Sequence, residues 1–530
     1  MPLLPPGDTI LAQLSIKMPS LKNGASPLEC SQYRAITHWL VRYRPRDNSN
    51  LAQVTGLIQA FTHLCDLKNW QAASQLLTLR LNTPTQEEFD NQLHTWGYYQ
   101  AQITLYDALL HKLNDEWDAI LFNGLGIAHN SLGNHRRALH YNQQQQSIAH
   151  TLNKPLVQAR CLGNTGLTHH CLGHFENAIA LYNQQLGIAR HRQHTPMMIQ
   201  ALAGMGSSHY QLKQYDQALS CYQLQQELMQ TGDDVPGQAK LQNNLGNLHF
   251  AKGDLEQAQQ AYKSWLTHTR QIGDRAGESH ALGNIGNVYQ ALGDAAQAIT
   301  YYQQDLAITK EIGDRRGQAH ATGNLATAYA TQEFFDTALD YAQQHLAQAQ
   351  ALGDQPHQQT ALTHLGNIHA RMNMRLDAIN CFQSALAIAE TLDDITNQAD
   401  LNEKLAYLYL QQHHYDKSIH RYQTAVTLAA QQQNTEHQLK LWNNLNRIYL
   451  TQKQPTHAIH CLRQILEIRL QLGDRFEIAK AWVMLGKALN NNNQSAPAIN
   501  AFQQAKNNFL ATTRQDLAAR CDTVLETLCP

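Results

Sequence analysis

The pattern of apolar, small and polar positions repeats every 40 residues over most of the chain. The first column of the pattern holds mostly small residues and recurs ten times without an insertion: Gly126, Gly166, Gly206, Gly246, Gly286, Ala326, Gly366, Ala406, Asn446 and Gly486. Twelve residues after each of these positions comes a second column, which runs from Ala138 to Ala498 and contains alanine everywhere except at Ser418. Two columns in unbroken alignment over ten units predict a repeat architecture.

Each unit contains two helical patterns. In the fifth unit, apolar residues three or four positions apart indicate both helices: Leu282, Ile285 and Tyr289 in the first, and Ala298, Tyr302 and Leu306 in the second. A turn is predicted between them at 292–294. The second run ends at Gly313 and Asp314, because glycine can adopt the left-handed cap conformation and aspartate can cap the helix that follows. The unit is therefore predicted to be an antiparallel helix pair, with small residues where the two helices cross.

The unit resembles the tetratricopeptide repeat family at six positions: Ile285, Gly286, Tyr289, Gly293, Ala298 and Tyr302. The common unit of that family has about 34 residues. The 40-residue form, with its turn at 313–315, is similar to the longer-helix branch that includes the LGN/Pins polarity adaptors and, more loosely, kinesin light chain. The resemblance implies an all-α, right-handed α-solenoid (superhelix) whose first helices line a concave groove. It also implies binding of peptides or protein segments.

The regularity of the pattern divides the chain into four regions. Residues 1–50 are richer in proline and are expected to be irregular, and residues 51–113 contain two degenerate helical hairpins. The ten repeat units occupy 114–508. Residues 509–530 would form a C-terminal cap helix, because a repeat array needs a solvated end.

Composition and charge exclude several classes of protein. The chain has 530 residues, with 14 prolines and 7% aromatics, which favours helices over sheets. Its formal net charge is −2, so no overall field would recruit nucleic acid or an anionic membrane. Neither a signal peptide nor a membrane-spanning run is present, and the nine cysteines include no C-x-x-C pair. We therefore expect a cytoplasmic protein with buried, reduced thiols.

The sequence contains no pattern typical of an enzyme or of a metal site. Histidine is frequent, at 28 residues, but five histidines (His129, His169, His209, His249 and His369) share one column of the repeat with tyrosines. A column that alternates histidine and tyrosine is typical of a packing position with a polar tip. No HExxH, GxxxxGK[ST], GxSxG or kinase motif occurs. We expect no catalytic residue, no metal and no cofactor.

Asparagine is enriched at the positions that the resemblance assigns to the groove. These are six positions per unit, at −6, −3, −2, +1, +4 and +5 relative to the first column. Asparagine fills 14 of the 60, where about four would be expected from its overall frequency. The candidates for ligand contact are Asn164, Asn243, Asn244, Asn247, Asn284, Asn287, Asn324, Asn367, Asn443 and Asn444.

Two interpretations of this enrichment remain open, because asparagine costs roughly 0.5 kcal/mol relative to alanine inside a helix. The amides of neighbouring units would hydrogen-bond to each other in a ladder, or their paired donor and acceptor would hold the backbone of an extended ligand.

Charge at the same 60 positions is uneven, with eight basic residues and two acidic ones. The basic candidates for ligand contact are Arg160, Lys240, Arg371 and Arg447, and His280 and His320 would add donors. Scattered surface charge is one interpretation. The other is a ligand with acidic residues or a free carboxylate, held by charge-assisted hydrogen bonds.

The leading hypothesis is a non-enzymatic scaffold or adaptor that binds an extended, acidic protein segment. Two alternatives stay open: an assembly factor for a multiprotein complex, photosynthetic if the source is cyanobacterial, and a peptide-responsive regulatory sensor. The sequence determines neither the partner nor the oligomeric state.

Overall fold

The computed structural model describes residues 3–16, 26–47, 49–83, 86–229 and 234–528. These residues form helices and one isolated β-bridge, between Arg80 and Glu88, so the predicted all-α fold is confirmed. The chain divides into two compact units, Met1–His268 and Thr269–Pro530. Over the described ranges, no helix has both the length and the apolar character needed to cross a bilayer.

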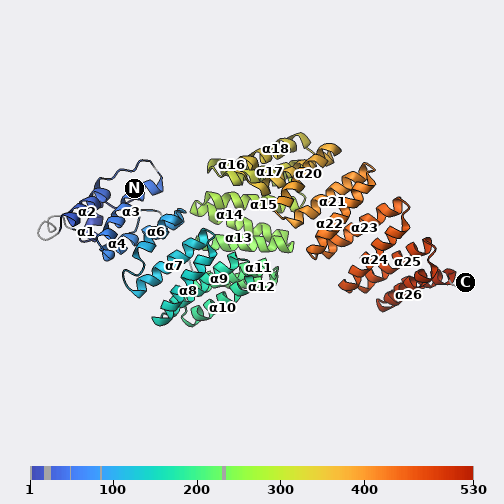
Figure 1. The fold of residues 1–530 in the computed structure, drawn as a ribbon, viewed down its shortest axis with the longest axis horizontal. Coiled ribbons are helices and arrows are strands. Elements are labelled where there is room, and N and C mark those ends of the chain that lie inside the picture. Colours follow the sequence, from blue (N-terminus) through green and yellow to red (C-terminus); the bar gives the residue numbers. More distant parts are fainter. Residues whose placement is uncertain (1–2, 17–25, 48, 84–85, 230–233, 529–530) are drawn as a thin grey trace. The chain divides into compact units, whose positions relative to one another are not determined.

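Unit 1 contains the helices α1 to α13 and most of α14 (Figure 1). Their bounds are α1 (Gly7–Gln13), α2 (Pro27–Thr37), the π-helix η2 (His38–Arg42), α3 (Asn50–Asp66), α4 (Trp70–Leu77), α5 (Phe89–Thr95), α6 (Tyr99–Leu109), α7 (Asp115–Ser131), α8 (His135–Thr151), α9 (Pro155–Cys171), α10 (Phe175–His191), α11 (Thr195–Gln211), α12 (Tyr215–Met229), α13 (Val235–Lys252) and α14 (Leu255–Ile272).

Unit 2 contains the remaining helices. Their bounds are α15 (Arg275–Ala291), α16 (Ala295–Glu311), α17 (Arg315–Thr331), α18 (Phe335–Leu352), α19 (Gln355–Arg371), α20 (Arg375–Thr391), α21 (Ile395–Gln411), α22 (Tyr415–Gln431), α23 (Thr435–Thr451), α24 (Pro455–Leu472), α25 (Arg475–Asn491), α26 (Ser495–Ala511) and α27 (Gln515–Leu528). Within each unit, consecutive helices pack as neighbours, which is the arrangement of an α-helical repeat protein.

The two helices of a pair approach closely because an aromatic ring lies on a glycine. A Cβ atom at Gly286 would lie 2.5 Å from Cε1 of Tyr302, which comes sixteen residues later on the second helix. The same contact occurs between Gly246 and Tyr262, where the distance would be 2.4 Å. The glycine column therefore makes room for a ring, and the ring is buried against the bare backbone of the first helix.

Gly-Asp turns end one helix pair and begin the next, as the sequence predicts. Gly313 has a φ angle of +72°, in the left-handed region where a side chain would be strained. The Asp314 carboxylate then accepts a hydrogen bond from the backbone N–H of Gly317 at 3.0 Å and caps α17. Gly273 with Asp274, and Gly353 with Asp354, repeat this arrangement. Because each turn has the same length, the 40-residue period is kept.

The N-terminal segment differs from the expectation of irregular structure, since α1, α2 and η2 lie within residues 7–42. Pro27 does not interrupt α2, because it occupies the first turn, where no backbone donor is needed. A capping box starts this helix. The Ser26 hydroxyl accepts from the N–H of Glu29 at 3.2 Å, and the Glu29 carboxylate accepts from the N–H of Ser26 at 2.7 Å.

One glycine inside a helix has no packing role. Gly187 of α10 is exposed, and a Cβ atom there would meet no other atom within 4 Å. We expect Gly187→Ala to raise the free energy of unfolding by about 0.5–1 kcal/mol, because alanine reduces the entropy lost on folding. Gly286→Val should instead lower it by about 1–3 kcal/mol, since the added atoms would overlap the ring of Tyr302. Urea denaturation of the two variants measures both effects, and equal effects would contradict the glycine–ring contact.

A buried carboxylate in unit 2 makes stability depend on pH. Burial raises the pKa of Asp305 to about 6 from its ordinary 3.8, although the Ser279 hydroxyl donates to it and partly offsets the shift. The contribution to stability is therefore complete below about pH 3.8 and is lost as pH rises through 6, because the folded state must then hold a buried charge. At pH 7.5, Asp305→Asn should have a free energy of unfolding about 2 kcal/mol higher than that of the wild type. This difference should disappear near pH 4. A constant difference across pH would contradict the burial of this charge.

Candidate functional site

The first helices of successive pairs lie beside one another and form a continuous surface within each unit, here called the first-helix face. In unit 1, the Asn164 Nδ2 of α9 donates to the Asn123 Oδ1 of α7 at 2.9 Å. In unit 2, Gln290 of α15 donates to the Thr331 hydroxyl of α17 at 3.0 Å, and His437 of α23 lies 2.9 Å from a carboxylate oxygen of Glu403 on α21. In each unit, the candidate asparagines therefore lie on first helices, and side-chain hydrogen bonds join some neighbouring first helices to each other.

Two of the candidate asparagines have a structural task. The Tyr302 hydroxyl donates to the Asn287 Oδ1 at 2.8 Å, and the Tyr262 hydroxyl donates to the Asn247 Oδ1 at the same distance. These are the tyrosines whose rings cover the glycine column. The ring is buried, and asparagine at position +1 satisfies its polar end. Asn367 occupies the same position, but Phe382 replaces the tyrosine there and has no hydroxyl to donate.

Four candidate asparagines keep a free carboxamide: Asn244, Asn284, Asn367 and Asn444. Each is half-buried, and none makes a side-chain hydrogen bond within the part of the chain that the structure describes. Asn244, Asn284 and Asn444 occupy position −2 of their 40-residue repeats. A half-buried amide without a protein partner must bond to water or to a ligand. These four residues are therefore the strongest candidates for ligand contact.

The other candidate asparagines bond within the protein. Asn164 donates to Asn123 of the preceding repeat and so forms a direct amide link of the kind that the ladder interpretation requires. Asn243 accepts from Asn247 at 3.3 Å, Asn443 donates to the Leu439 carbonyl at 2.7 Å, and Asn324 lies 3.3 Å from Nδ1 of His320. Gly283, at position −3, faces the second helix, because a Cβ atom there would lie 3.0 Å from Oδ2 of Asp305.

Some of the basic candidates are already paired. Arg371 donates to the Ala330 carbonyl, lies 3.6 Å from Glu333 and covers the Phe335 ring at 5.3 Å. Three further cations at first-helix positions, Lys404, Lys440 and Lys480, also have acidic partners. In contrast, Arg160, Lys240 and Arg447 are exposed, and their side chains form no hydrogen bond or ion pair with a described residue. The uncompensated positive charge on this face is confined to a few separate residues.

The two histidine candidates, His320 and His280, lie in different surroundings. His320 belongs to a cluster in unit 2 whose rings lie 5.9–6.4 Å apart: His320, His345, His357 and His364. Desolvation lowers the pKa of His320, and burial lowers the pKa of His345 to about 3 and of His364 to about 4. His280 is exposed beside Asp305. Among described residues, no group of three or more His, Cys, Asp or Glu is arranged to hold a metal ion.

The histidine and tyrosine column packs as the sequence predicts. His129 stacks on Tyr141, and Tyr329 stacks on Tyr341, with ring centroids 5.4 and 5.5 Å apart. The Tyr329 hydroxyl accepts from Gln303 of the preceding pair at 3.1 Å. Ring stacking in this column therefore joins the two helices of a pair, and the polar tip of Tyr329 joins its pair to the preceding one.

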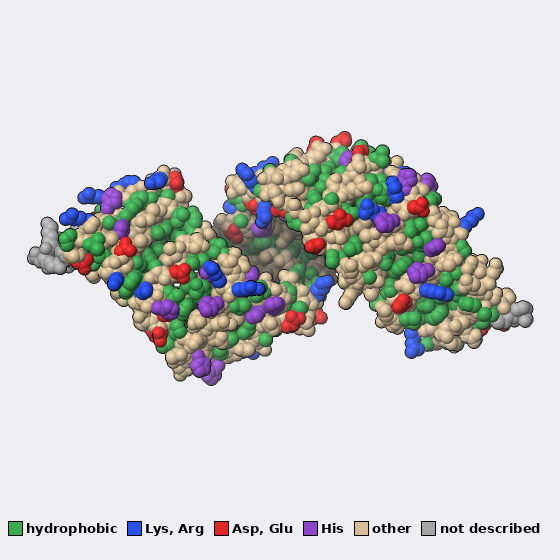
Figure 2. Space-filling model, in the orientation of Figure 1, with side chains coloured by type: hydrophobic (Ala, Val, Ile, Leu, Met, Phe, Trp, Pro, Cys, Tyr) green, Lys and Arg blue, Asp and Glu red, His purple; other side chains and the backbone are tan. Residues whose placement is uncertain are grey.

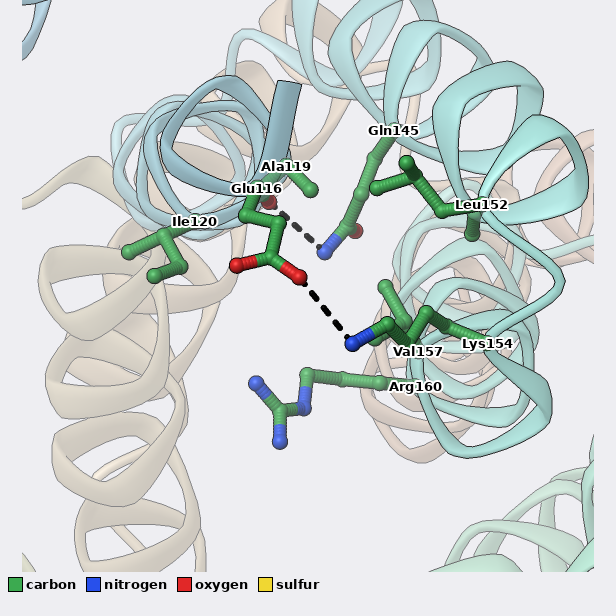
Figure 3. Close-up of a pocket in the computed structure, with 9 residues that line it drawn as sticks. Glu116, Ala119, Ile120, Gln145, Leu152, Lys154, Val157 and Arg160 are labelled. Carbon is green, nitrogen blue, oxygen red and sulfur yellow. Dashed lines mark hydrogen bonds and ion pairs between the residues drawn. The ribbon is translucent and has the colours of Figure 1, made fainter. Parts of the chain in front are cut away.

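Arg160 lies at a pocket of about 230 Å³ between α7, α8 and α9 (Figure 3). Lys154 pairs with Glu116 at 3.0 Å, and Gln145 donates to the Ala119 carbonyl at 3.0 Å, but no bond is drawn to the guanidinium of Arg160. The Gln145 Oε1 is buried without a partner among described residues. The pocket thus offers one free cation and one free acceptor above apolar side chains.

A larger cavity of about 700 Å³ in unit 1 shares Ile120 and Arg160 with this pocket. Sequence reasoning missed its polar wall. The Tyr106 hydroxyl donates to Oδ2 of Asp90 at 3.0 Å, and Gln102 donates to the Tyr106 oxygen at 3.1 Å. Burial raises the pKa of Asp90 to about 6. These residues come from the degenerate region before the repeats, where no column of equivalent positions could indicate them.

On the face seen in Figure 2, basic and acidic side chains are interspersed within each unit, without an extended area of one sign. This distribution agrees with the small net charge and with the few unpaired cations of the first-helix face. Any recognition of charge must therefore depend on individual residues.

The fold defines an α-helical repeat protein, and comparison of sequences identifies the repeat. The model of the tetratricopeptide repeat family matches residues 197–271, 277–351 and 317–391. This part of the chain therefore consists of tetratricopeptide repeats. A search of curated protein sequences found no match.

Solved structures of similar fold have low sequence identity to this chain. They include the apo form of the quorum sensor NprR from B. thuringiensis (15% identity, 72% of this chain and 97% of that chain covered, TM-score 0.45) and a Rap protein complexed with competence and sporulation factor (15%, 70% and 97%, 0.42). Another is BtubC from P. vanneervenii (18% identity, 48% of this chain and 92% of that chain covered, TM-score 0.35). Matches of this quality do not indicate what the chain binds.

The two candidate asparagines of the fifth repeat, Asn284 and Asn287, should respond differently to substitution. We expect Asn287→Ala to lower the free energy of unfolding by about 1 kcal/mol, because it leaves the Tyr302 hydroxyl without an acceptor. Asn284→Ala should be neutral or stabilising by about 0.5 kcal/mol, since alanine is the better helix former. In a Tyr302→Phe background the cost of Asn287→Ala should disappear, and denaturation of the four proteins in a double-mutant cycle measures this. An unchanged cost in that background would contradict the structural role of Asn287.

Proposed function

We propose that this protein is a non-enzymatic adaptor that binds an extended protein segment with acidic residues on its first-helix face. The observation that carries the proposal is the set of half-buried carboxamides without protein partners: Asn244 in unit 1, and Asn284, Asn367 and Asn444 in unit 2. Helix packing does not require these side chains, and helix propensity disfavours them.

A carboxamide suits a ligand that is recognised through its backbone. It provides a donor and an acceptor side by side, which matches the N–H and C=O groups of an extended peptide whatever its side chains are. The occurrence of the group on three first helices of unit 2, at position −2 in Asn284 and Asn444 and at position +1 in Asn367, supports a ligand that follows several helices. Tetratricopeptide repeats, as the resemblance implies, bind protein segments in this manner.

The preference for acidic residues rests on the unpaired cations. Arg160 and Lys240 in unit 1, and Arg447 in unit 2, are exposed and free to pair with carboxylates. Charge-assisted hydrogen bonds are stronger than neutral ones, and because these cations are exposed, salt should weaken their pairing with carboxylates. His320, whose pKa is lowered by desolvation, adds hydrogen-bonding capacity.

The proposal predicts that three asparagines of unit 2 control partner capture. The variant Asn284→Ala, Asn367→Ala, Asn444→Ala should retain less than about a tenth of each partner that the tagged wild type captures from a lysate of its source organism, as three lost hydrogen bonds imply. Its melting temperature should be unchanged or higher, because alanine favours the helix. Quantitative mass spectrometry of the captured proteins, with circular dichroism as a check on folding, provides the measurement.

A matched control removes three asparagines from second helices of the same unit. Asn380, Asn500 and Asn507 are exposed and have no side-chain hydrogen bond with a described residue. Their triple alanine variant should capture partners as the wild type does. Equal capture by both variants would exclude the first-helix face of unit 2 as the binding surface.

A further inference from the structure

An apolar pocket lies at the C-terminal end of unit 2, where α27 packs beside α25 and α26. Its volume is about 470 Å³, within the range of sites that bind small molecules. Seven of its lining side chains are apolar, three are cationic, and the remaining one is the buried thiol of Cys521. This pocket is separate from the asparagines on which the proposed function rests.

The pocket interrupts the polar character of the first-helix face. Val483 and Met484 of α25 occupy the −3 and −2 positions, where asparagine stands at Asn443 and Asn444 in the preceding unit. Leu517 of α27 faces the same cavity, and Met484 is 42% exposed. The first helix of the final pair, α25, therefore presents apolar side chains that α27 only partly covers.

Two cations at the pocket have no protein partner. Lys480 pairs with Glu477 at 2.8 Å, but Lys487 of α25 and Arg520 of α27 are exposed and bond to no described residue. They come from two different helices, α25 and α27, and both line the cavity. No acidic side chain of a described residue lines the pocket, so a ligand with one negative charge would meet a complementary rim.

The lining also excludes a peptide backbone from the interior. It contains no amide, hydroxyl, imidazole or carboxyl side chain, so the N–H and C=O groups of a peptide would lose their bonds to water without replacement. A hydrocarbon chain has no such requirement and gains from the burial of its surface.

We propose that this pocket binds a single-chain anionic amphiphile, of which a long-chain carboxylate is the simplest. The alkyl chain lies among Val483, Met484, Phe509 and Leu517, and the carboxylate pairs with Lys487 and Arg520. Both cations belong to the same site, which holds the head group at the solvent-exposed rim.

Isothermal titration of the full-length protein with dodecanoate, below its micellar concentration, tests the proposal. The wild type should bind it saturably, with one site per chain. Lys487→Gln with Arg520→Gln should weaken binding about tenfold or more, because two charge-assisted bonds are lost. Val524→Trp should abolish binding by filling the cavity. If the tryptophan variant fails to fold, as its circular dichroism would reveal, the charge variant still decides the question.

Two controls test whether dodecanoate binds through this pocket and its two cations. Lys453→Gln with Arg463→Gln removes two cations of unit 2 that have no partner among described residues and do not line the pocket, so dodecanoate binding should not change. Dodecyltrimethylammonium, with the same chain and the opposite charge, should bind at least about tenfold more weakly than dodecanoate. Equal binding of the two amphiphiles, or no saturable binding of dodecanoate, would overturn the proposal.

An acetylated peptide that ends in a leucine carboxylate offers the same charge with a peptide backbone. Tighter binding of this peptide than of dodecanoate, lost in the Val524→Trp variant, would also overturn the proposal. None of these outcomes depends on Asn284, Asn367 or Asn444, so failure here and failure of partner capture are distinguishable.

Discussion

The contact between a glycine on the first helix and an aromatic ring on the second is the constraint on which the repeat depends. A side chain at Gly286 would overlap the ring of Tyr302, so the backbone itself forms the surface that the ring covers. The contact is not absolute. In the eighth 40-residue repeat, Ala406 shares a core cluster with Tyr422. In the sixth repeat, both partners are alanines, Ala326 and Ala342. A ring can therefore shift to admit one methyl group, or a smaller partner can remove the need for glycine.

Burial of a tyrosine ring creates a second requirement, because its hydroxyl needs an acceptor. Asn287 provides one for Tyr302, and Asn247 provides one for Tyr262. The same residue type at position −2 has no such task, since Asn284 and Asn444 bond to no described residue. A single enrichment in the sequence thus has two physical origins. Some of these asparagines, such as Asn287, stabilise the fold, and others, such as Asn284, leave hydrogen-bonding groups available to a ligand.

Electrostatics on the first-helix face is local. Arg371 and Lys440 are engaged by neighbouring groups of the protein, and the buried imidazoles of His345 and His364 are neutral because burial lowers their pKa. Only isolated cations remain to attract an acidic partner. The pocket at α27 also presents unpaired cations, Lys487 and Arg520, at the rim of an apolar interior. In this last repeat, Val483 and Met484 replace the asparagines.

The sequence by itself determined the helix pairs, their 40-residue period and the Gly-Asp turns. These follow from local spacing and capping, and Gly313 with Asp314 shows that the residues suffice. It did not distinguish Asn284 from Asn287, because both lie on one helix and only the position of Tyr302 on the next separates them. It also did not indicate the helices of residues 7–42, which lie in a proline-richer segment expected to be irregular, or the buried Asp90. The tertiary structure decided which polar groups are satisfied, because their partners lie on other helices. The 15-residue spacing between Asn287 and Tyr302 recurs between Asn247 and Tyr262, but only the packing of the helices shows that these side chains meet.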